Sequence, residues 1–180
     1  DRAKDAAEHV MIVDLVRNDL GRVARPGGVT VEELLRVVEV ENVFHLESVV
    51  CGDLADDVGL VEVVTALSPG GSITGAPKSA AVEVIHDLEA GPRGPYTGTL
   101  GVVDANGWGA FNILIRTWLR PDGQPGRLHV GGGIVADSTP QQEWQETLDK
   151  AAAFSEVTVG QRGVKLGGTS DRFVVEQVVL

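Results

Sequence analysis

The sequence predicts an α+β fold in which antiparallel strands pack against helices. Helical spacing of apolar residues runs through residues 1–15 and again through the stretch that begins at Pro140. Between these helices, residues 99–135 read as a β-meander, because the Asn106-Gly107 pair is a strong signal for a tight hairpin turn. A further strand is expected over residues 42–54, whose side chains divide into two faces.

The composition is that of a globular protein and disfavours several classes of partner. The chain has 180 residues, of which 43% are apolar, and this is enough for one domain with its own core. A net charge of −11 disfavours binding to a nucleic-acid backbone. No apolar run approaches the roughly 20 residues that a membrane helix needs, so no membrane contact is expected.

Cys51 is the only cysteine, so an internal disulfide is impossible and a reducing, cytoplasmic location is expected. The opening residues, DRAKDAAEH, contain neither an initiator methionine nor a signal peptide. We therefore expect the sequence to be a piece of a longer protein.

The helix over residues 1–15 presents an acidic pair, because Asp5 and Glu8 are three residues apart. Such a pair is usually a solvated face, or it joins a second pair to bind a divalent cation. The apolar face of this helix is expected to consist of Ala3, Ala7, Val10 and Met11. Farther on, residues 31–38 are expected to form a short amphipathic helix.

His45 lies on the more polar face of the strand over residues 42–54, where a structural role is one interpretation. Ser48 falls on the opposite face, because successive side chains of a strand alternate. This argues against a nucleophilic pair of Ser48 and His45.

A glycine-rich loop over residues 68–78 follows a helix expected over residues 56–67, whose inward face is expected to consist of Leu60, Val61, Val64 and Leu67. Gly70 and Gly75 have the separation of a phosphate-binding loop, but Pro77 removes a backbone donor that such a loop would use. Pro77 is instead expected to open a helix to about residue 89, with buried Ala81, Val84, Ile85 and Leu88. The loop suits an anion such as a carboxylate.

Arg116 is expected inside a strand over residues 110–119, flanked by apolar residues. A guanidinium in that setting needs an anionic partner, from the protein or from a substrate. Tyr96 is the only tyrosine, and its hydroxyl could meet a ligand or a backbone carbonyl.

The stretch over residues 131–150, GGGIVADSTPQQEWQETLDK, combines a run of glycines with an expected charged helix. Three glycines allow a ligand to approach the chain closely, and Thr139 and Pro140 are expected to begin the helix. Glu143, Glu146 and Lys150 then share one helix face. This arrangement suits a small anion with a hard cation, or else a solvated surface with a Glu–Lys pair.

Several long motifs occur in a fixed order along the chain: EHVMIVDLVRNDLGRV (Glu8–Val23), VFHLES (Val43–Ser48), PGGSITGAPK (Pro69–Lys78), RGPYTGTLG (Arg93–Gly101), IRT (Ile115–Thr117) and the stretch over residues 131–150. Together they resemble the chorismate-utilising enzymes, which include component I of aminodeoxychorismate synthase and of anthranilate synthase. The resemblance implies the C-terminal half of the chorismate-binding fold. We expect a partial chorismate-binding domain over residues 1–156 and a C-terminal tail over residues 157–180.

The resemblance also implies a magnesium site and a substrate site. Glu8 and Glu146 match the Mg²⁺-binding glutamates, and Asp5 and Glu143 match the accessory acidic positions beside them. The residues that match groups holding the substrate are Ser72, Tyr96, Arg116, Lys150 and the amides of Gly131 and Gly133, and His45 matches a histidine implicated in the chemistry. Chorismate is a small dianion, which a magnesium ion and an arginine would bind in an otherwise acidic protein.

Within the family, GGSITGAPK and GGGIVADS resemble aminodeoxychorismate synthase more than anthranilate synthase, and RNDLGRV disfavours the isochorismate and salicylate branches. The implied reaction replaces the ring hydroxyl of chorismate with an amine, on the route to 4-aminobenzoate and folate. A glutamine amidotransferase would supply the ammonia. Anthranilate synthase, of tryptophan biosynthesis, is the alternative.

The sequence departs from the family pattern in three places. Ala80-Ala81-Val82 replaces the usual Arg-Ala-Met, and Trp144 replaces the tyrosine of the EYQET pattern. A PIxGT-type motif with a catalytic lysine or its equivalent, which precedes these motifs in the family, is missing from the sequence. We therefore expect little or no turnover from these 180 residues alone.

Overall fold

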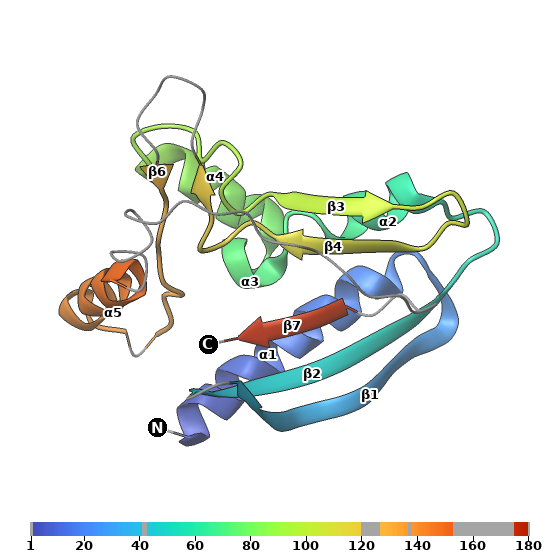
Figure 1. Ribbon diagram of the computed structural model, residues 1–180, viewed down its shortest axis with the longest axis horizontal. Coiled ribbons are helices and arrows are strands. Elements are labelled where there is room, and N and C mark those ends of the chain that lie inside the picture. Colours follow the sequence, from blue (N-terminus) through green and yellow to red (C-terminus); the bar gives the residue numbers. More distant parts are fainter. Residues whose placement is uncertain (1, 41–42, 120–126, 137, 153–174, 180) are drawn as a thin grey trace. The chain divides into compact units, whose positions relative to one another are not determined.

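The computed structural model describes residues 2–40, 43–119, 127–136, 138–152 and 175–179 (Figure 1). The chain divides into two compact units. The first comprises residues 1–92, 101–111 and 172–180, and the second comprises residues 93–100 and 112–171. Helices and antiparallel sheets occur together, which confirms the α+β class.

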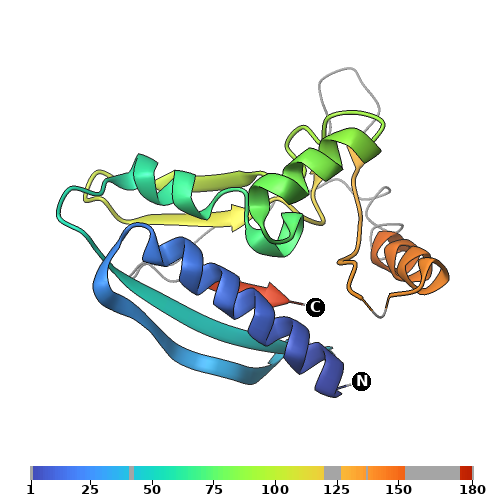
Figure 2. The ribbon, with the colours of Figure 1, turned by 180° about the vertical axis from the view of Figure 1, so that it is seen from behind.

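The first unit is built on a three-stranded antiparallel sheet of β1 (Ala24–Val40), β2 (Val43–Leu54) and β7 (Val175–Val179), in the order β1-β2-β7. Helix α1 (Arg2–Gly21) lies across this sheet (Figure 2). The apolar end of the sequence, residues 173–180, predicts a strand, and the described part of it forms β7. The division of the chain at residue 156 stays a prediction.

The predicted helix over residues 31–38 is wrong, because these residues belong to β1. Val31 pairs with Val50, and Val37 and Val38 pair with Leu46 and His45 of β2. β-Branched residues favour a strand that has a partner, and the long partner β2 outweighs the helical spacing. The ladder is irregular near Leu35, where the backbone angle φ is +56°.

The core of the first unit consists of Val13, Leu20 and Val50, with Val16, Val29 and Leu67 packed against it. The face expected to be apolar is wrong, since Val10 and Met11 are 44% and 51% exposed. Apolar residues occur on more than one side of α1, so spacing alone does not select the buried face.

The glycine-rich loop lies between two of the predicted helices. They are α2 (Leu60–Leu67) and α4 (Lys78–Leu88), and the loop also contains the short α3 (Gly71–Thr74). The predicted inward face of α2 is right for Leu67, which packs against the core, but wrong for Leu60 and Val61, which are 39% and 72% exposed while Val63 and Ala66 are buried. The predicted face of α4 is wrong, because α4 has no fully buried residue among those described. A methyl group on Gly71 would lie 3.0 Å from Leu15 Cδ1, so this glycine permits close packing of α3 on α1.

The Asn106-Gly107 turn joins β3 (Thr99–Val103) to β4 (Gly109–Ile113), as predicted. The Asp104 carboxylate accepts the backbone N–H groups of Asn106 and Trp108, and Gly107 has φ of +85°. The strand expected to continue to residue 119 ends at Ile113. A separate pair follows, β5 (Trp118–Leu119) with β6 (Arg127–Leu128). The sequence PDGQPG over residues 121–126 predicts a turn between them, and these residues lie outside the described part of the chain.

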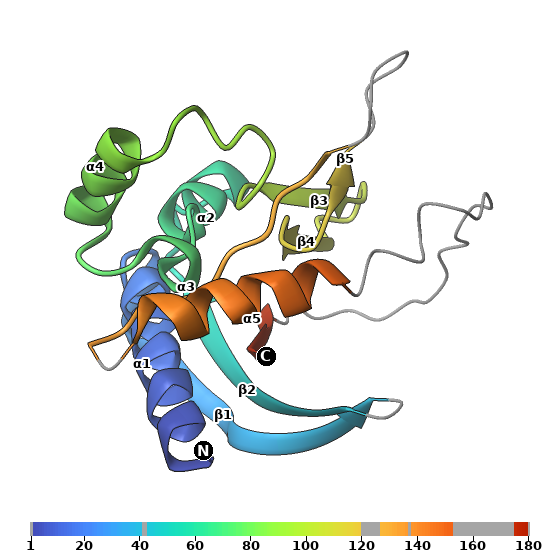
Figure 3. The ribbon, with the colours of Figure 1, turned by 90° about the vertical axis from the view of Figure 1, so that its left-hand side faces the viewer.

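Helix α5 (Pro140–Ala152) confirms the start predicted at Pro140 (Figure 3). The Thr139 hydroxyl lies 2.8 Å from Gln142 Oε1, and the Thr139 carbonyl accepts the N–H of Glu143. The sequence also predicts that this helix ends near residue 156, a position that lies outside the described residues. Among the residues that the structure describes, no helix has both the length and the apolar character needed to span a bilayer.

Candidate functional site

In the second unit, several residues implicated by the resemblance gather around the glycine segment, which we define as residues 131–133. The members are Tyr96, Glu143, Glu146 and Lys150, together with Gly131 itself. They come from a turn, the glycine segment and α5, so the local fold of this unit is sufficient to bring them together.

Lys150 connects α5 to the glycine segment. Its Nζ atom lies 2.5 Å from Glu146 Oε1 and donates at 3.4 Å to the carbonyl of Gly131. The side chain of Lys150 is 22% exposed, whereas that of Glu146 is 50% exposed. The Glu–Lys pair is thus partly covered on the lysine side and leaves half of the glutamate open to a ligand.

Glu143 presents its carboxylate to the backbone of Gly132. Its Oε1 atom accepts a hydrogen bond from the Ser138 hydroxyl, and that hydroxyl accepts the N–H of Val135 at 3.0 Å. The Oε2 atom is buried and has no hydrogen-bond partner among the described residues. A methyl group on Gly132 would lie 3.0 Å from Oε2. A buried carboxylate oxygen without a partner suits a cation.

Tyr96 lies against the other side of the same segment, because a methyl group on Gly131 would lie 2.9 Å from its hydroxyl. Its ring stacks on the imidazole of His129, with centroids 5.4 Å apart and an interplanar angle of 25°. The guanidinium carbon of Arg93 is 5.8 Å from the Tyr96 centroid. The sequence-based interpretation missed His129, for which the only indication was its place two residues before the glycine segment.

Arg116 differs from its prediction. It follows the end of β4 with φ of +50° and is exposed, and it forms no ion pair with any residue that the structure describes. The chain leaves the β3–β4 ladder because Leu114 exchanges backbone hydrogen bonds with Thr97 and Gly98 instead. This exchange brings the segment that contains Arg116 alongside the one that contains Tyr96.

Gly133 is exposed, and a methyl group there would meet nothing within 4 Å. Steric crowding therefore explains the glycines at 131 and 132 but not the one at 133. The predicted role of the Gly133 amide stays a prediction.

The remaining predicted site residues belong to the first unit. Asp5 and Glu8 lie on α1, His45 on β2 and Ser72 on α3. Glu8, His45 and Ser72 are half-buried, and the Nδ1 atom of His45 has no hydrogen-bond partner among the described residues. Glu8 and Glu146 lie in different units, so their convergence on one metal stays a prediction. Within the described residues, no three His, Cys, Asp or Glu side chains form a metal-binding group.

A buried histidine and serine join α1 to β2, and the sequence-based interpretation missed the pair. His9 Nε2 lies 2.7 Å from Ser48 Oγ, which also accepts the N–H of Leu35 at 3.0 Å. His9 is 1% exposed, and burial lowers the pKa of its imidazole below 6.5. The serine therefore pairs with a histidine that lies far away in the sequence and not with His45.

Lys78 has a structural partner, which supports the rejection of a phosphate-binding loop. Its Nζ atom lies 2.6 Å from Asp19 Oδ2, and the two side chains are 21% and 8% exposed. The ammonium also donates to the carbonyl of Ala66 at 3.4 Å. The ion pair connects the start of α4 to α1 and does not leave this lysine free for a phosphate.

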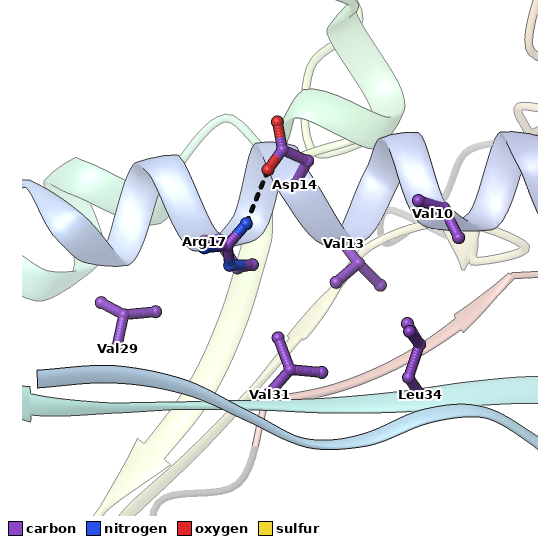
Figure 4. A pocket seen from close by; sticks show the side chains of 7 residues that line it. All are labelled: Val10, Val13, Asp14, Arg17, Val29, Val31 and Leu34. Atoms are coloured by element: carbon purple, nitrogen blue, oxygen red, sulfur yellow. Dashed lines mark hydrogen bonds and ion pairs between the residues drawn. The ribbon is translucent and has the colours of Figure 1, made fainter. Parts of the chain in front are cut away.

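A groove of about 270 Å³ lies between α1 and β1 in the first unit (Figure 4). Its walls are mostly apolar, and Arg17 and Asp14 form an ion pair of 2.9 Å on α1 beside it. None of the predicted site residues lines it, so it is not the expected site for a dianionic substrate. The lining residues are Val10, Val13, Asp14, Arg17, Val29, Val31 and Leu34.

Comparison with known proteins identifies the family. The model of the chorismate binding enzymes matches residues 1–156. The chain belongs to the chorismate-binding enzyme family. This finding confirms the resemblance that the motifs indicated.

Curated relatives in the chorismate-binding family carry two different names. The chain is 48% identical over 154 residues to anthranilate synthase component 1 of Haloarcula marismortui, covering 86% of this chain and 31% of the relative. It is 46% identical over 151 residues to aminodeoxychorismate synthase component 1 of Bacillus subtilis, covering 84% of this chain and 32% of the relative. The chain thus spans about a third of the length of these relatives.

Two solved structures of the chorismate-binding family resemble the fold. Anthranilate synthase component I from Streptococcus pneumoniae matches with a TM-score of 0.71 and 38% identity, over 82% of this chain and 34% of that chain. A putative 2,3-dihydroxybenzoate-specific isochorismate synthase from Bacillus anthracis matches with a TM-score of 0.73 and 31% identity, over 87% and 42%. The fold is therefore shared across branches with different named products.

Proposed function

We propose that this chain supplies the chorismate-binding site of an enzyme that aminates chorismate to 4-amino-4-deoxychorismate. The family match and the relatives support an enzyme that acts on chorismate. The single observation that supports the site best is the cluster of Tyr96, Glu143 and Lys150 around the glycine segment.

The substrate carboxylates are bound in this proposal by groups beside the glycine segment. Arg116 is exposed, with no ion pair to a described residue, so its guanidinium is open to an anion. The Tyr96 hydroxyl and the amides of Gly131 and Gly133 supply neutral donors. Lys150 is paired with Glu146 and contributes positive charge beside them. Ser72 on α3 adds a hydroxyl for the substrate.

The acidic residues fit a magnesium ion. The unpartnered, buried Oε2 atom of Glu143 is the observation that supports this fit, since such an oxygen needs a donor or a cation. Glu146 and Glu143, together with Glu8 and Asp5 on α1, would hold the ion. Bound there, it would act as a Lewis acid on the carboxylate side of the substrate. His45 would hold or move a proton near the substrate ring through an imidazole nitrogen.

Anthranilate synthase is the second candidate, because its component 1 is as similar to the chain as the aminodeoxychorismate relative is. The GGSITGAPK and GGGIVADS motifs favour the first candidate. Either reaction would take ammonia from a glutamine amidotransferase partner, and we place the protein in the cytoplasm. Since little or no turnover is expected from these 180 residues alone, the two are distinguished by chromatographic identification of the product that a longer protein containing them forms from chorismate, Mg²⁺ and ammonia.

Binding of chorismate by the chain is the direct test. We expect calorimetric titration with chorismate to require Mg²⁺, and we expect Glu8→Gln and Glu146→Gln each to weaken that Mg²⁺-dependent binding at least about tenfold. Glu83→Gln is a matched control, because Glu83 is exposed on α4. Binding that persists unchanged in both variants would refute the metal assignment, and a wild-type chain that binds no chorismate would refute the proposed site.

A further inference from the structure

We propose that His129 is a positioning residue for Tyr96, which fixes the plane of the tyrosine ring so that its hydroxyl stays over Gly131. The consequence for the ligand rests on the proposed function, since the hydroxyl is one of the groups assigned to the substrate carboxylates. Neither the motifs nor the resemblance assigned a role to His129.

The first argument is the geometry of the two rings. Their centroids are 5.4 Å apart and their planes are inclined by only 25°, which is a stacked arrangement. Both side chains are half-buried, so the contact is partly removed from water. A flat ring beside the phenol restricts rotation of the phenol about its own axis, because an edge-on phenol would collide with the imidazole.

The second argument is that one segment contacts Tyr96 at two points. His129 touches the ring, and Gly131, two residues later, lies under the hydroxyl. The carbonyl of Gly131 is in turn bonded to Lys150. The position of the segment therefore determines both the plane of the ring and the direction of the hydroxyl relative to the ammonium of Lys150.

The third argument concerns the cation beside the ring. The guanidinium carbon of Arg93 lies 5.8 Å from the Tyr96 centroid, within the range in which a cation is attracted to an aromatic ring. That attraction depends on the orientation of the ring, because the negative potential is on its face. A ring held in one plane by His129 maintains this interaction as well as the placement of the hydroxyl.

His129 acts through Tyr96 in this proposal and contacts no reacting atom. A side chain that only fills space would be replaced equally well by leucine. A side chain that positions the ring by stacking would be replaced by phenylalanine and not by leucine. The variants His129→Phe, His129→Leu and His129→Ala therefore separate the two roles, and His86→Ala on α4 is a matched histidine control that is exposed.

The chain offers a direct spectroscopic test, because Tyr96 is its only tyrosine. Incorporation of 3-fluorotyrosine therefore gives a fluorine signal from this residue alone. In the ligand-free chain we expect His129→Ala and His129→Leu to move the chemical shift of that resonance toward the value of free 3-fluorotyrosine. We expect His129→Phe and His86→Ala to leave the chemical shift at its wild-type value. An unshifted resonance in His129→Ala, or an equal effect of Phe and Leu, would overturn the proposal.

The second measurement follows the same resonance during titration with chorismate and Mg²⁺. We expect His129→Ala to weaken binding about tenfold, the upper range for loss of a stacked pair, and His129→Phe to restore it. Wild-type affinity in His129→Ala would overturn the positioning role. If the wild-type resonance does not respond to chorismate, the proposed function fails, and the ligand-free spectra still decide whether His129 positions Tyr96.

Discussion

At the scale of single residues, a side chain at Gly131 or Gly132 would crowd a functional group of the candidate site. A methyl group at the first would lie 2.9 Å from the Tyr96 hydroxyl, and one at the second would lie 3.0 Å from Glu143 Oε2. Neither glycine is explained by a left-handed backbone conformation, since neither has a positive φ. The two glycines allow the Tyr96 hydroxyl and the Glu143 carboxylate to approach the backbone closely, and a larger residue would displace them.

We predict that Gly131→Ala displaces the Tyr96 hydroxyl and weakens chorismate binding, with a loss of stability of about 1 kcal/mol from overpacking. Gly91→Ala is the control, because Gly91 is exposed, has no assigned role in the site, and has nothing within 4 Å of its added methyl group. Calorimetric titration and chemical unfolding of both variants measure the two effects. Equal affinities in the two variants would contradict the prediction.

We predict that the His9–Ser48 pair makes stability depend on pH. Burial lowers the pKa of His9 below its ordinary 6.5, so the folded protein disfavours the protonated form more than the unfolded chain does. This contribution to stability is present above pH 6.5 and is lost as the pH falls toward the lower pKa of the folded state. Urea unfolding at a series of pH values measures it.

His9→Gln keeps a side chain that can hydrogen-bond to Ser48 and removes the titrating group, so it should flatten the pH dependence of stability below 6.5. All other titratable groups are the same in both proteins, so the difference between their curves of unfolding free energy against pH isolates the contribution of His9. Identical slopes in the two proteins would show that this histidine does not contribute.

Some of the candidate functional residues could be grouped from the sequence alone, and others could not. Glu143, Glu146 and Lys150 share one face of a helix that the sequence predicts well, and spacing on that helix places them together. The Tyr96–His129 stack and the His9–Ser48 bond join residues far apart in the sequence. Such pairs depend on tertiary packing, which no local spacing reports, and Arg116 was misplaced for the same reason.

At the scale of elements, the ion pair of Asp19 and Lys78 connects α1 to the start of α4. We predict that Lys78→Met destabilises the first unit by about 3 kcal/mol, because it leaves the largely buried Asp19 carboxylate without its counter-ion. Removing both charges in Asp19→Leu with Lys78→Met should recover most of that loss. Chemical denaturation of the single and double variants measures both values.

The exposed pair of Asp14 and Arg17 gives the comparison for that experiment, since its side chains are 74% and 51% exposed. Arg17→Met should change stability by no more than about 0.5 kcal/mol. A similar loss in both single variants would mean that burial does not control the strength of these pairs.

The elements themselves were predicted unequally. Helix α5, strand β2 and the β3–β4 hairpin carry strong local signals, respectively a helix start with Pro140, a β-branched run and the Asn106-Gly107 turn. β1 was taken for a helix over residues 31–38, since a short valine-rich segment fits both patterns. Pairing with β2 decides between them, and pairing is not visible in one segment alone.

At the scale of the whole molecule, the first unit depends on a strand that comes from far along the chain. β7 pairs with β2 from Leu46 to Val50, which covers an edge that would otherwise expose unpaired N–H and C=O groups. We predict that replacing residues 172–180 with a glycine–serine sequence of equal length lowers the stability of the first unit and promotes self-association. Sedimentation velocity and urea unfolding measure these effects.

The matched control for this replacement is Gln177→Ala, which retains the backbone hydrogen bonds opposite Ser48. It should remain monodisperse to the same extent as the parent chain. Equal association of the parent and the replaced chain would show that β7 does not protect the edge of β2.

The pairing of β2 with β7 also affects when the sheet of the first unit can be completed during synthesis. A ribosome completes β2 early and adds β7 only after α2, α4, the hairpin and α5 have been translated. Throughout that interval the nascent polypeptide presents an open sheet margin, and long-range strand pairing is slow and vulnerable to misassembly. Translational pausing after α5 would lengthen this exposure, so chaperone demand during synthesis should rise with the time that separates these two strands.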